Sequence, residues 1–172
     1  MLYGVYNPYQ KSKIVAREFP NLSIDGKDLK FVKLFKYLGH LICNDLSDDA
    51  DIKREIRNLF IRANTLRRKF SYCSLRVKLR LYKAFCLCLY GCALWKRSSY
   101  AVRYSFKSSC NICMKIVMGY RKYDSVTNML LVTGLPSHET YLHNARMSFR
   151  LRLLSCENVL VSHLSSLNLG LV

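Results

Sequence analysis

The stretch of sequence that decides the fold runs from residue 48 to residue 70 and reads DDADIKREIRNLFIRANTLRRKF. Its apolar residues recur at steps of four, three, four, three and four, at Ile52, Ile56, Leu59, Ala63, Leu66 and Phe70. This spacing places them on one side of an α-helix, so the stretch predicts a long amphipathic helix. Ser47, Asp48 and Asp49 predict its N-cap and the negative charge that a helix amino terminus favours.

A second helix is expected from about residue 75 to residue 95, after a polar break at residues 71–74. One of its faces would carry Leu75, Leu79, Tyr82, Cys86 and Leu89. Residues 84–95 carry no charge, but as a helix they would rise only about 18 Å, well short of the ~30 Å hydrocarbon core of a bilayer. They therefore predict a buried helix. Two amphipathic helices joined by a short link predict an antiparallel hairpin.

The segment before this hairpin has a strand-like pattern. Short apolar runs occupy residues 14–19, 22–24, 29–35 and 37–43. Gly39 interrupts the last run, and Asp25-Gly26 predicts a turn between the second and the third. We therefore expect a small antiparallel sheet or a pair of hairpins.

The segment after the hairpin predicts further helices. A third helix is expected at about residues 100–118, where Gly119 stops it, and shorter segments follow near 125–132 and 136–154. Pro136 and Ser137 are typical of the start of the last one. The expected fold class is mainly α with a small N-terminal antiparallel β region, divided into residues 1–46, 47–97 and 98–172.

The charge of the chain predicts an anionic partner. Its 28 Lys and Arg residues against 11 Asp and Glu residues give a formal charge of +17. Such an excess opposes compaction unless a polyanion neutralises it, which favours nucleic acid; a ribosomal or membrane-surface protein could have the same total. With no signal sequence at the start, we expect an intracellular protein, nuclear or cytoplasmic, with eight reduced cysteines.

The positive charge is densest on the predicted helical hairpin. From residue 53 to residue 83, Glu55 is the one acid among eleven basic residues, namely Lys53, Arg54, Arg57, Arg62, Arg67, Arg68, Lys69, Arg76, Lys78, Arg80 and Lys83. Arg57, Asn64 and Arg68 share one face of the first helix, and Arg76, Arg80 and Lys83 share one face of the second. A solvated face normally mixes both signs, so these faces predict contact with phosphates that weakens steeply as salt rises.

Other patterns give weaker predictions. Cys110 and Cys113, with Cys88 and Cys92, could form a four-thiolate metal site between two helices, but buried thiols are the better interpretation. The four histidines are scattered, and no glycine-rich phosphate loop occurs. We expect no metal site and no cofactor in this chain.

A series of short elements between residues 7 and 95 carries a family resemblance. In order they are Asn7-Pro8-Tyr9-Gln10-Lys11-Ser12-Lys13, Ile24-Asp25-Gly26, Phe35-Lys36-Tyr37-Leu38-Gly39, Asp51-Ile52-Lys53-Arg54-Glu55-Ile56, the run Lys69-Phe70-Ser71-Tyr72-Cys73, and Tyr90-Gly91-Cys92-Ala93-Leu94-Trp95. Their order and spacing resemble the end of the palm and the thumb in the reverse transcriptases of non-LTR retrotransposons, of the chicken-repeat and jockey-like group.

The resemblance implies a role for several residues. Lys11 would lie near the phosphates of the incoming nucleotide, and Tyr37, Leu38 and Gly39 would belong to the primer-grip hairpin. The helices of residues 48–95 would form a thumb that holds an RNA–DNA template–primer duplex by its backbone, and the palm of the parent polymerase would be a partner.

The resemblance also implies what this chain does not do. In the family, the aspartates that hold the catalytic magnesium ions lie upstream of the lysine element, and only six residues precede Asn7. Asp48-Asp49 is interpreted as a helix cap, so we expect no catalytic residue here. The alternatives are a stand-alone basic helical nucleic-acid-binding protein and an inert translated remnant that exposes surfaces meant for the palm.

Overall fold

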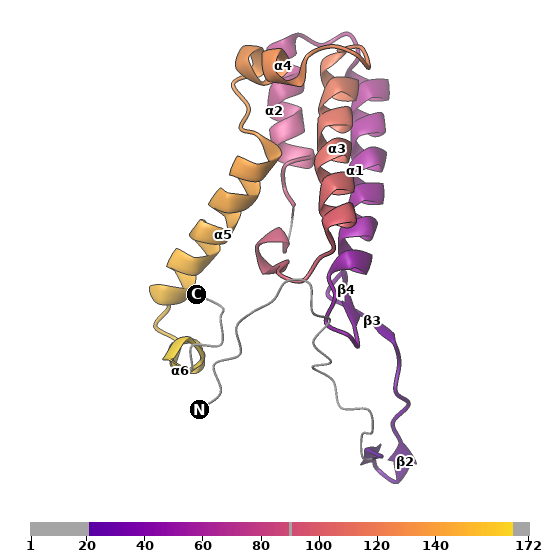
Figure 1. Ribbon diagram of the computed structural model, residues 1–172, viewed down its shortest axis with the longest axis vertical. Helices are drawn as coiled ribbons and strands as arrows, with labels where there is room; N and C mark the ends of the chain where they lie inside the picture. Colours follow the sequence, from indigo (N-terminus) through magenta and orange to yellow (C-terminus); the bar gives the residue numbers. More distant parts are fainter. Residues whose placement is uncertain (1–20, 90, 167–172) are drawn as a thin grey trace.

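The computed structural model describes residues 21–89 and 91–166. In chain order the elements are β1 (Ser23–Ile24), β2 (Lys27–Asp28), β3 (Leu34–Tyr37), β4 (His40–Cys43), α1 (Asp49–Phe70), α2 (Leu75–Phe85), the 3₁₀ helix η1 (Cys92–Leu94), α3 (Tyr100–Met118), α4 (Val126–Thr133), α5 (His138–Leu154) and α6 (Val159–Ser166). The fold is mainly α with a small antiparallel β region on its N-terminal side, as predicted (Figure 1). The run at residues 14–19 and the element at residues 7–13, with Lys11, lie outside the described residues.

The four strands form two separate antiparallel hairpins. In the second hairpin Leu34 pairs with Cys43 and Tyr37 pairs with His40. Leu38 and Gly39 form its turn with φ angles of 46° and 85°, both in the left-handed region that two-residue hairpin turns favour. Of the two expected arrangements the structure has the pair of hairpins, and the glycine that interrupts the run at residues 37–43 marks a reversal of the chain.

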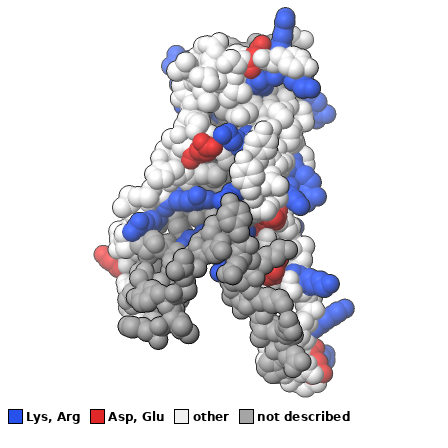
Figure 2. Space-filling model, in the orientation of Figure 1, with Lys and Arg blue, Asp and Glu red and all other residues white. Residues whose placement is uncertain are grey.

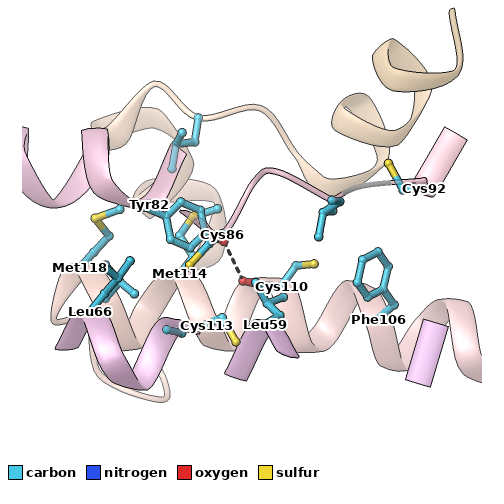
Figure 3. Packing of buried hydrophobic residues seen from close by; sticks show 14 of the residues in the cluster. Leu59, Leu66, Tyr82, Cys86, Cys92, Phe106, Cys110, Cys113, Met114 and Met118 are labelled. Carbon is cyan, nitrogen blue, oxygen red and sulfur yellow. Dashed lines mark hydrogen bonds between the residues drawn. The ribbon is translucent and has the colours of Figure 1, made fainter. Parts of the chain in front are cut away.

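The stripe that predicted the first helix faces the core. Four of its six residues, Ile52, Leu59, Ala63 and Leu66, are buried in α1, and the other two are partly buried against the same cluster. α3 supplies the opposite side of this core with Phe106, Cys110, Cys113, Met114 and Val117. Tyr82 of α2 fills the space between them, and its hydroxyl donates to the carbonyl of Cys110 at 3.4 Å (Figure 3). The first predicted helix is confirmed.

The second predicted helix was wrong beyond residue 85. α2 ends at Phe85, residues 86–89 lie outside any helix or strand, and η1 begins at Cys92. Gly91 has a φ of 76°, and a Cβ atom placed on it would lie 2.2 Å from the ring of His40. The apolar run is nevertheless buried, since Cys86, Leu89, Cys92 and Trp95 all belong to the core. Among the described residues no helix is long and apolar enough to cross a membrane.

Helices α3, α4 and α5 begin and end close to the predicted positions, whereas α6 was not predicted. α3 covers Tyr100–Met118 with Gly119 as its C-cap. Ser99, Ser125 and Ser137 are the N-caps of α3, α4 and α5, and each side chain accepts a hydrogen bond from a backbone N–H three residues later. α5 packs against η1 and α3. The Tyr141 hydroxyl of α5 also donates a hydrogen bond to the carbonyl of Leu87.

The direction of the helices brings two links to one end of the molecule. α1 and α3 both run toward this end, and α2 returns from it, as Figure 1 shows. The α1–α2 link and the α3–α4 link therefore lie at the same end. We call the residues 67–76 and 119–124 the distal end. The β3–β4 hairpin lies at the opposite end of α1, which at 22 residues is about 33 Å long.

Candidate nucleic-acid interface

Asp51 fixes the β3–β4 hairpin to the first turn of α1. Asp51 as a whole residue is 3% exposed. Its Oδ1 accepts from the backbone N–H of Leu41 at 3.0 Å and from Nε of Arg54 at 2.8 Å. Oδ2 lies 2.9 Å from both Nδ1 of His40 and Nε1 of Trp95. Burial opposes the charge, but these hydrogen bonds outweigh it and lower the pKa of Asp51 to about 2. Asp51 is therefore a charged anchor of the fold.

Asp48 and Asp49 do not act as side-chain caps of α1. Asp48 occupies the N-cap position but makes no side-chain cap bond. Its Oδ2 instead accepts from the backbone N–H groups of Lys96 and Arg97 at 2.8 and 2.6 Å, and Oδ1 of Asp49 accepts from the N–H of Ser99 at 2.8 Å. The capping interpretation was wrong in this respect, because a segment distant in sequence supplies the donors. The two carboxylates hold the start of α3 beside the start of α1.

Two of the eleven basic residues of the hairpin, Arg54 and Arg62, pair with buried carboxylates. Glu55 is buried and accepts from Nη2 of Arg62 and, at 3.3 Å, from Nη1 of Arg54. For the other nine, no carboxylate of the described part of the chain lies within ion-pair distance. Eight of these nine are exposed, namely Lys53, Arg57, Arg67, Arg68, Lys69, Arg76, Arg80 and Lys83. Most of the predicted cationic surface is thus available to solvent.

The predicted site residues of α1 lie on a face that points away from the core. Arg57 and Arg68 are exposed, and Asn64 lies between them on the same face. Lys53 and Arg67 extend this row along the helix. Figure 2 shows Lys and Arg side chains projecting at several heights along the edge of the molecule that α1 forms. The row follows the helix axis for much of its length.

The predicted site residues of α2 form a second row. Arg76, Arg80 and Lys83 are all exposed and share one face of the helix, beside the face that buries Tyr82. The two rows belong to different helices and approach one another at the α1–α2 link. There the exposed side chains of Arg68 and Arg76 flank Tyr72, which is fully exposed.

The distal end also includes cations that the sequence analysis missed. Arg121, Lys122 and Tyr123 of the α3–α4 link are exposed, and Lys122 lies over the Tyr123 ring with its Nζ 5.5 Å from the centroid. The sequence contained a signal for this. Residues 56–123 contain sixteen Lys and Arg residues and no Asp or Glu, whereas five of the chain's 11 acids lie within residues 45–55. The distal end is therefore almost free of carboxylates, with Asp124 at its border.

The predicted primer-grip residues lie far from these cations. Tyr37, Leu38 and Gly39 form the tip region of the β3–β4 hairpin, at the opposite end of α1 from Arg68. Tyr37 and Leu38 line a largely apolar cavity of about 910 Å³ between the hairpin, residues 88, 89 and 91–95, and α5. Arg152 is the one Lys or Arg side chain among the described residues that line it. The structure thus separates the predicted site into a cationic part and an apolar part.

The thiols fill the core. Cys86, Cys92, Cys110 and Cys113 are buried, and burial raises the pKa of each thiol, to about 12 for Cys86 and Cys113. Cys88 is exposed on the irregular segment. Within the described ranges, no three His, Cys, Asp or Glu side chains gather closely enough to hold a metal ion.

Three comparisons with known proteins found no match for this chain. No family model matches the sequence, no curated protein is similar to it, and no solved structure matches its fold.

Proposed function

We propose that this chain binds nucleic acid through the distal end and the two cationic rows of α1 and α2, as the C-terminal, thumb-like fragment of a retrotransposon reverse transcriptase. It would hold an RNA–DNA template–primer duplex by its backbone. The observation that supports this most strongly is a set of exposed cations that have no described carboxylate within ion-pair distance, namely Arg57, Arg67, Arg68, Lys69, Arg76, Arg80 and Lys83.

The chemistry of these rows suits the phosphate backbone. Arg and Lys on a helix face contact phosphates without reading sequence, and each neutralised phosphate releases condensed counterions. The row on α1 from Lys53 to Arg68 is about 22 Å long, so its cations can contact several successive phosphates of one strand. The exposed rings of Tyr72 and Tyr123 offer stacking surfaces for bases at a duplex end.

The apolar surface at the other end fits a neighbour in the parent polymerase. Phe31, Val32, Phe35, Tyr37 and Leu38 are each at least half exposed on the hairpins. A patch of this kind is typical of an interface, and the palm of the parent polymerase is the partner that the family resemblance implies. In the parent family the palm would also supply magnesium through its own carboxylates. The reduced thiols agree with an intracellular setting, nuclear or cytoplasmic.

Titration of a labelled RNA–DNA hybrid at two salt concentrations tests the proposal. The variant R68Q/R76Q/R80Q removes three exposed cations of the rows, and the matched control K27Q/K30Q/K33Q removes three exposed cations of the β hairpins. The slope of log K against log salt should fall by about 2 to 3 in the first variant, since each lost contact contributes about 0.9, and by less in the control.

Two results would contradict the proposal. Affinity that does not change with salt would exclude a phosphate grip, and equal losses in both variants would mean that net charge alone attracts the hybrid. The stand-alone binder and the inert remnant are separated by folding behaviour. A remnant would bind an apolar dye and melt without cooperativity, whereas a stand-alone binder would melt cooperatively and bind little dye.

A further inference from the structure

A second cavity lies between the first half of α3 and the first half of α5, away from the distal end. Its volume is about 530 Å³, within the range of small-molecule sites. Trp95, Phe106 and Leu142 give it apolar walls, and Arg103 and Arg146 contribute positive charge. Its lining thus combines flat apolar surface with cations.

His138 is the unexplained group of this cavity. Both of its ring nitrogens are buried, and neither has a hydrogen-bond partner in the described part of the chain. Its ring meets Phe106 edge to face, with centroids 4.8 Å apart. Burial lowers the pKa of His138 to about 4, so near neutral pH the ring is uncharged and carries one donor and one acceptor. Buried polar atoms without partners are rare in folded proteins and indicate a missing ligand or water.

The charges around the cavity favour an anion. Glu139 is the one carboxylate among its described lining residues, and Lys107 neutralises it with an Nζ–Oε1 distance of 2.7 Å. Arg103 is exposed and has no described carboxylate beside it. Arg146 uses Nη2 to donate to the carbonyl of Trp95 at 3.1 Å and keeps its other donors. The cavity therefore has spare positive charge at its rim.

Aromatic rings stand at the mouth. Tyr100 and Tyr104 are exposed neighbours on one face of α3, with ring centroids 6.4 Å apart and planes inclined by 24°. Both line the cavity together with Phe106 and Trp95. Flat rings beside a buried donor–acceptor pair are the surfaces that bind a nucleobase by stacking and by its polar edge.

We propose that the cavity between α3 and α5 binds a single nucleotide, with its phosphate on Arg103 and Arg146 and its base against the aromatic walls, where a rotation of the His138 ring brings one of its buried nitrogens to the base. This site stands apart from the duplex grip and does not depend on it. The nucleotide can be free or can be the unpaired end of a strand, since both present the same phosphate and base.

Trp95 provides the measurement, because it is the only tryptophan of the chain and lines the cavity. The full chain is titrated with AMP, CMP and UMP, with the corresponding nucleosides, and with inorganic phosphate. Nucleoside monophosphates should change the Trp95 fluorescence saturably, and nucleosides or phosphate alone should bind at least about tenfold more weakly, because each makes only half of the contacts. Displacement of the monophosphate by a hybrid with a single-stranded end assigns the site to a strand end; no displacement assigns it to a free nucleotide.

Three variants separate binding from folding. His138→Phe keeps a ring against Phe106 and removes the two unpartnered nitrogens, so it should fold at least as stably and lose at least about tenfold in affinity. Arg103→Gln should lose a similar factor, and Arg150→Gln, an exposed position of α5 outside the cavity, should bind nucleotides normally. The proposal is overturned if no monophosphate alters the fluorescence, if inorganic phosphate binds as tightly, or if the His138 and Arg103 variants bind like the unaltered chain.

Discussion

The replacement Asp51→Asn tests the anchor between α1 and the β3–β4 hairpin. The carboxylate receives two donors on each oxygen, whereas an amide can accept on one side only. An amide nitrogen on the Oδ1 side would oppose the N–H of Leu41 and the guanidinium of Arg54. On the Oδ2 side it would meet His40, which can turn into an acceptor by changing tautomer, and the Nε1–H of Trp95, which cannot.

The amide nitrogen should therefore take the place of Oδ2, because this orientation costs the least free energy, and its cost gives the expected loss of stability. It leaves the buried Trp95 N–H unpaired, which costs about 1 to 3 kcal/mol, and removes the charge that strengthens the Arg54 bond, worth about 1 kcal/mol more. The total is about 2 to 4 kcal/mol. The pKa of Asp51 gives a similar size, since lowering it from 3.8 to about 2 corresponds to roughly 2.5 kcal/mol. Folding stabilities are usually only about 5 to 15 kcal/mol, so the loss is a large fraction.

Urea unfolding followed by Trp95 fluorescence measures this change. For an m value of about 2 kcal/mol/M, the midpoint should fall by about 1 to 2 M. Glu157→Gln, an exposed position with the same change of charge, should leave the midpoint unchanged. The stabilisation from Asp51 should be complete above its ordinary pKa of 3.8 and be lost as the pH falls through about 2. Equal midpoints for Asp51→Asn and the unaltered chain would refute the assigned anchor.

Three further predictions concern other parts of the core. Gly91→Ala should destabilise the fold by about 2 to 4 kcal/mol in urea unfolding, because it adds a side chain at positive φ and pushes on the His40 ring; an unchanged midpoint would contradict that close approach. Lowering the pH from 6.5 toward 4 should destabilise the unaltered chain relative to His138→Phe, because His138 is protonated at a higher pH in the unfolded chain than in the folded one. The expected loss is about 1 to 2 kcal/mol, since solvent screening reduces the effect for this partly exposed group; parallel pH profiles of the two proteins would contradict it. A thiol reagent at pH 8 should modify Cys88 quickly and Cys113 only at the rate of unfolding, as mass spectrometry of the labelled peptides can show.

The spacing of nearby residues predicted those helices whose start, face and end are determined by residues close in sequence. The stripe from Ile52 to Phe70 and the stop at Gly119 each carry their own signal, and the structure has both. The sequence contains no such signal for the end of α2, because a continuous apolar run is equally compatible with a buried helix and with a buried irregular segment. The chain leaves the helix there to reach the ring of His40, about fifty residues earlier, and no local rule anticipates that contact.

The candidate sites also contain features that the sequence predicts and features that it does not. The cationic rows follow from helical spacing, so Arg57, Arg68 and Arg76 could be placed from sequence. The anchor role of Asp51 and the cavity of His138 could not, since each depends on side chains brought from distant segments by the packing of α1, α3 and α5. The link cations near Arg121 join the distal end for the same reason.

The unequal charge of the two ends has a kinetic consequence. Among the described residues, one end carries almost only positive charge, while the other mixes lysines of the hairpins with the carboxylates of residues 45–55. A long polyanion that drifts near the molecule is drawn to the first end and meets partial repulsion at the second. Salt screens this attraction beyond about 8 Å at physiological ionic strength. The molecule therefore turns its distal end toward the polyanion only when the two are within about that distance.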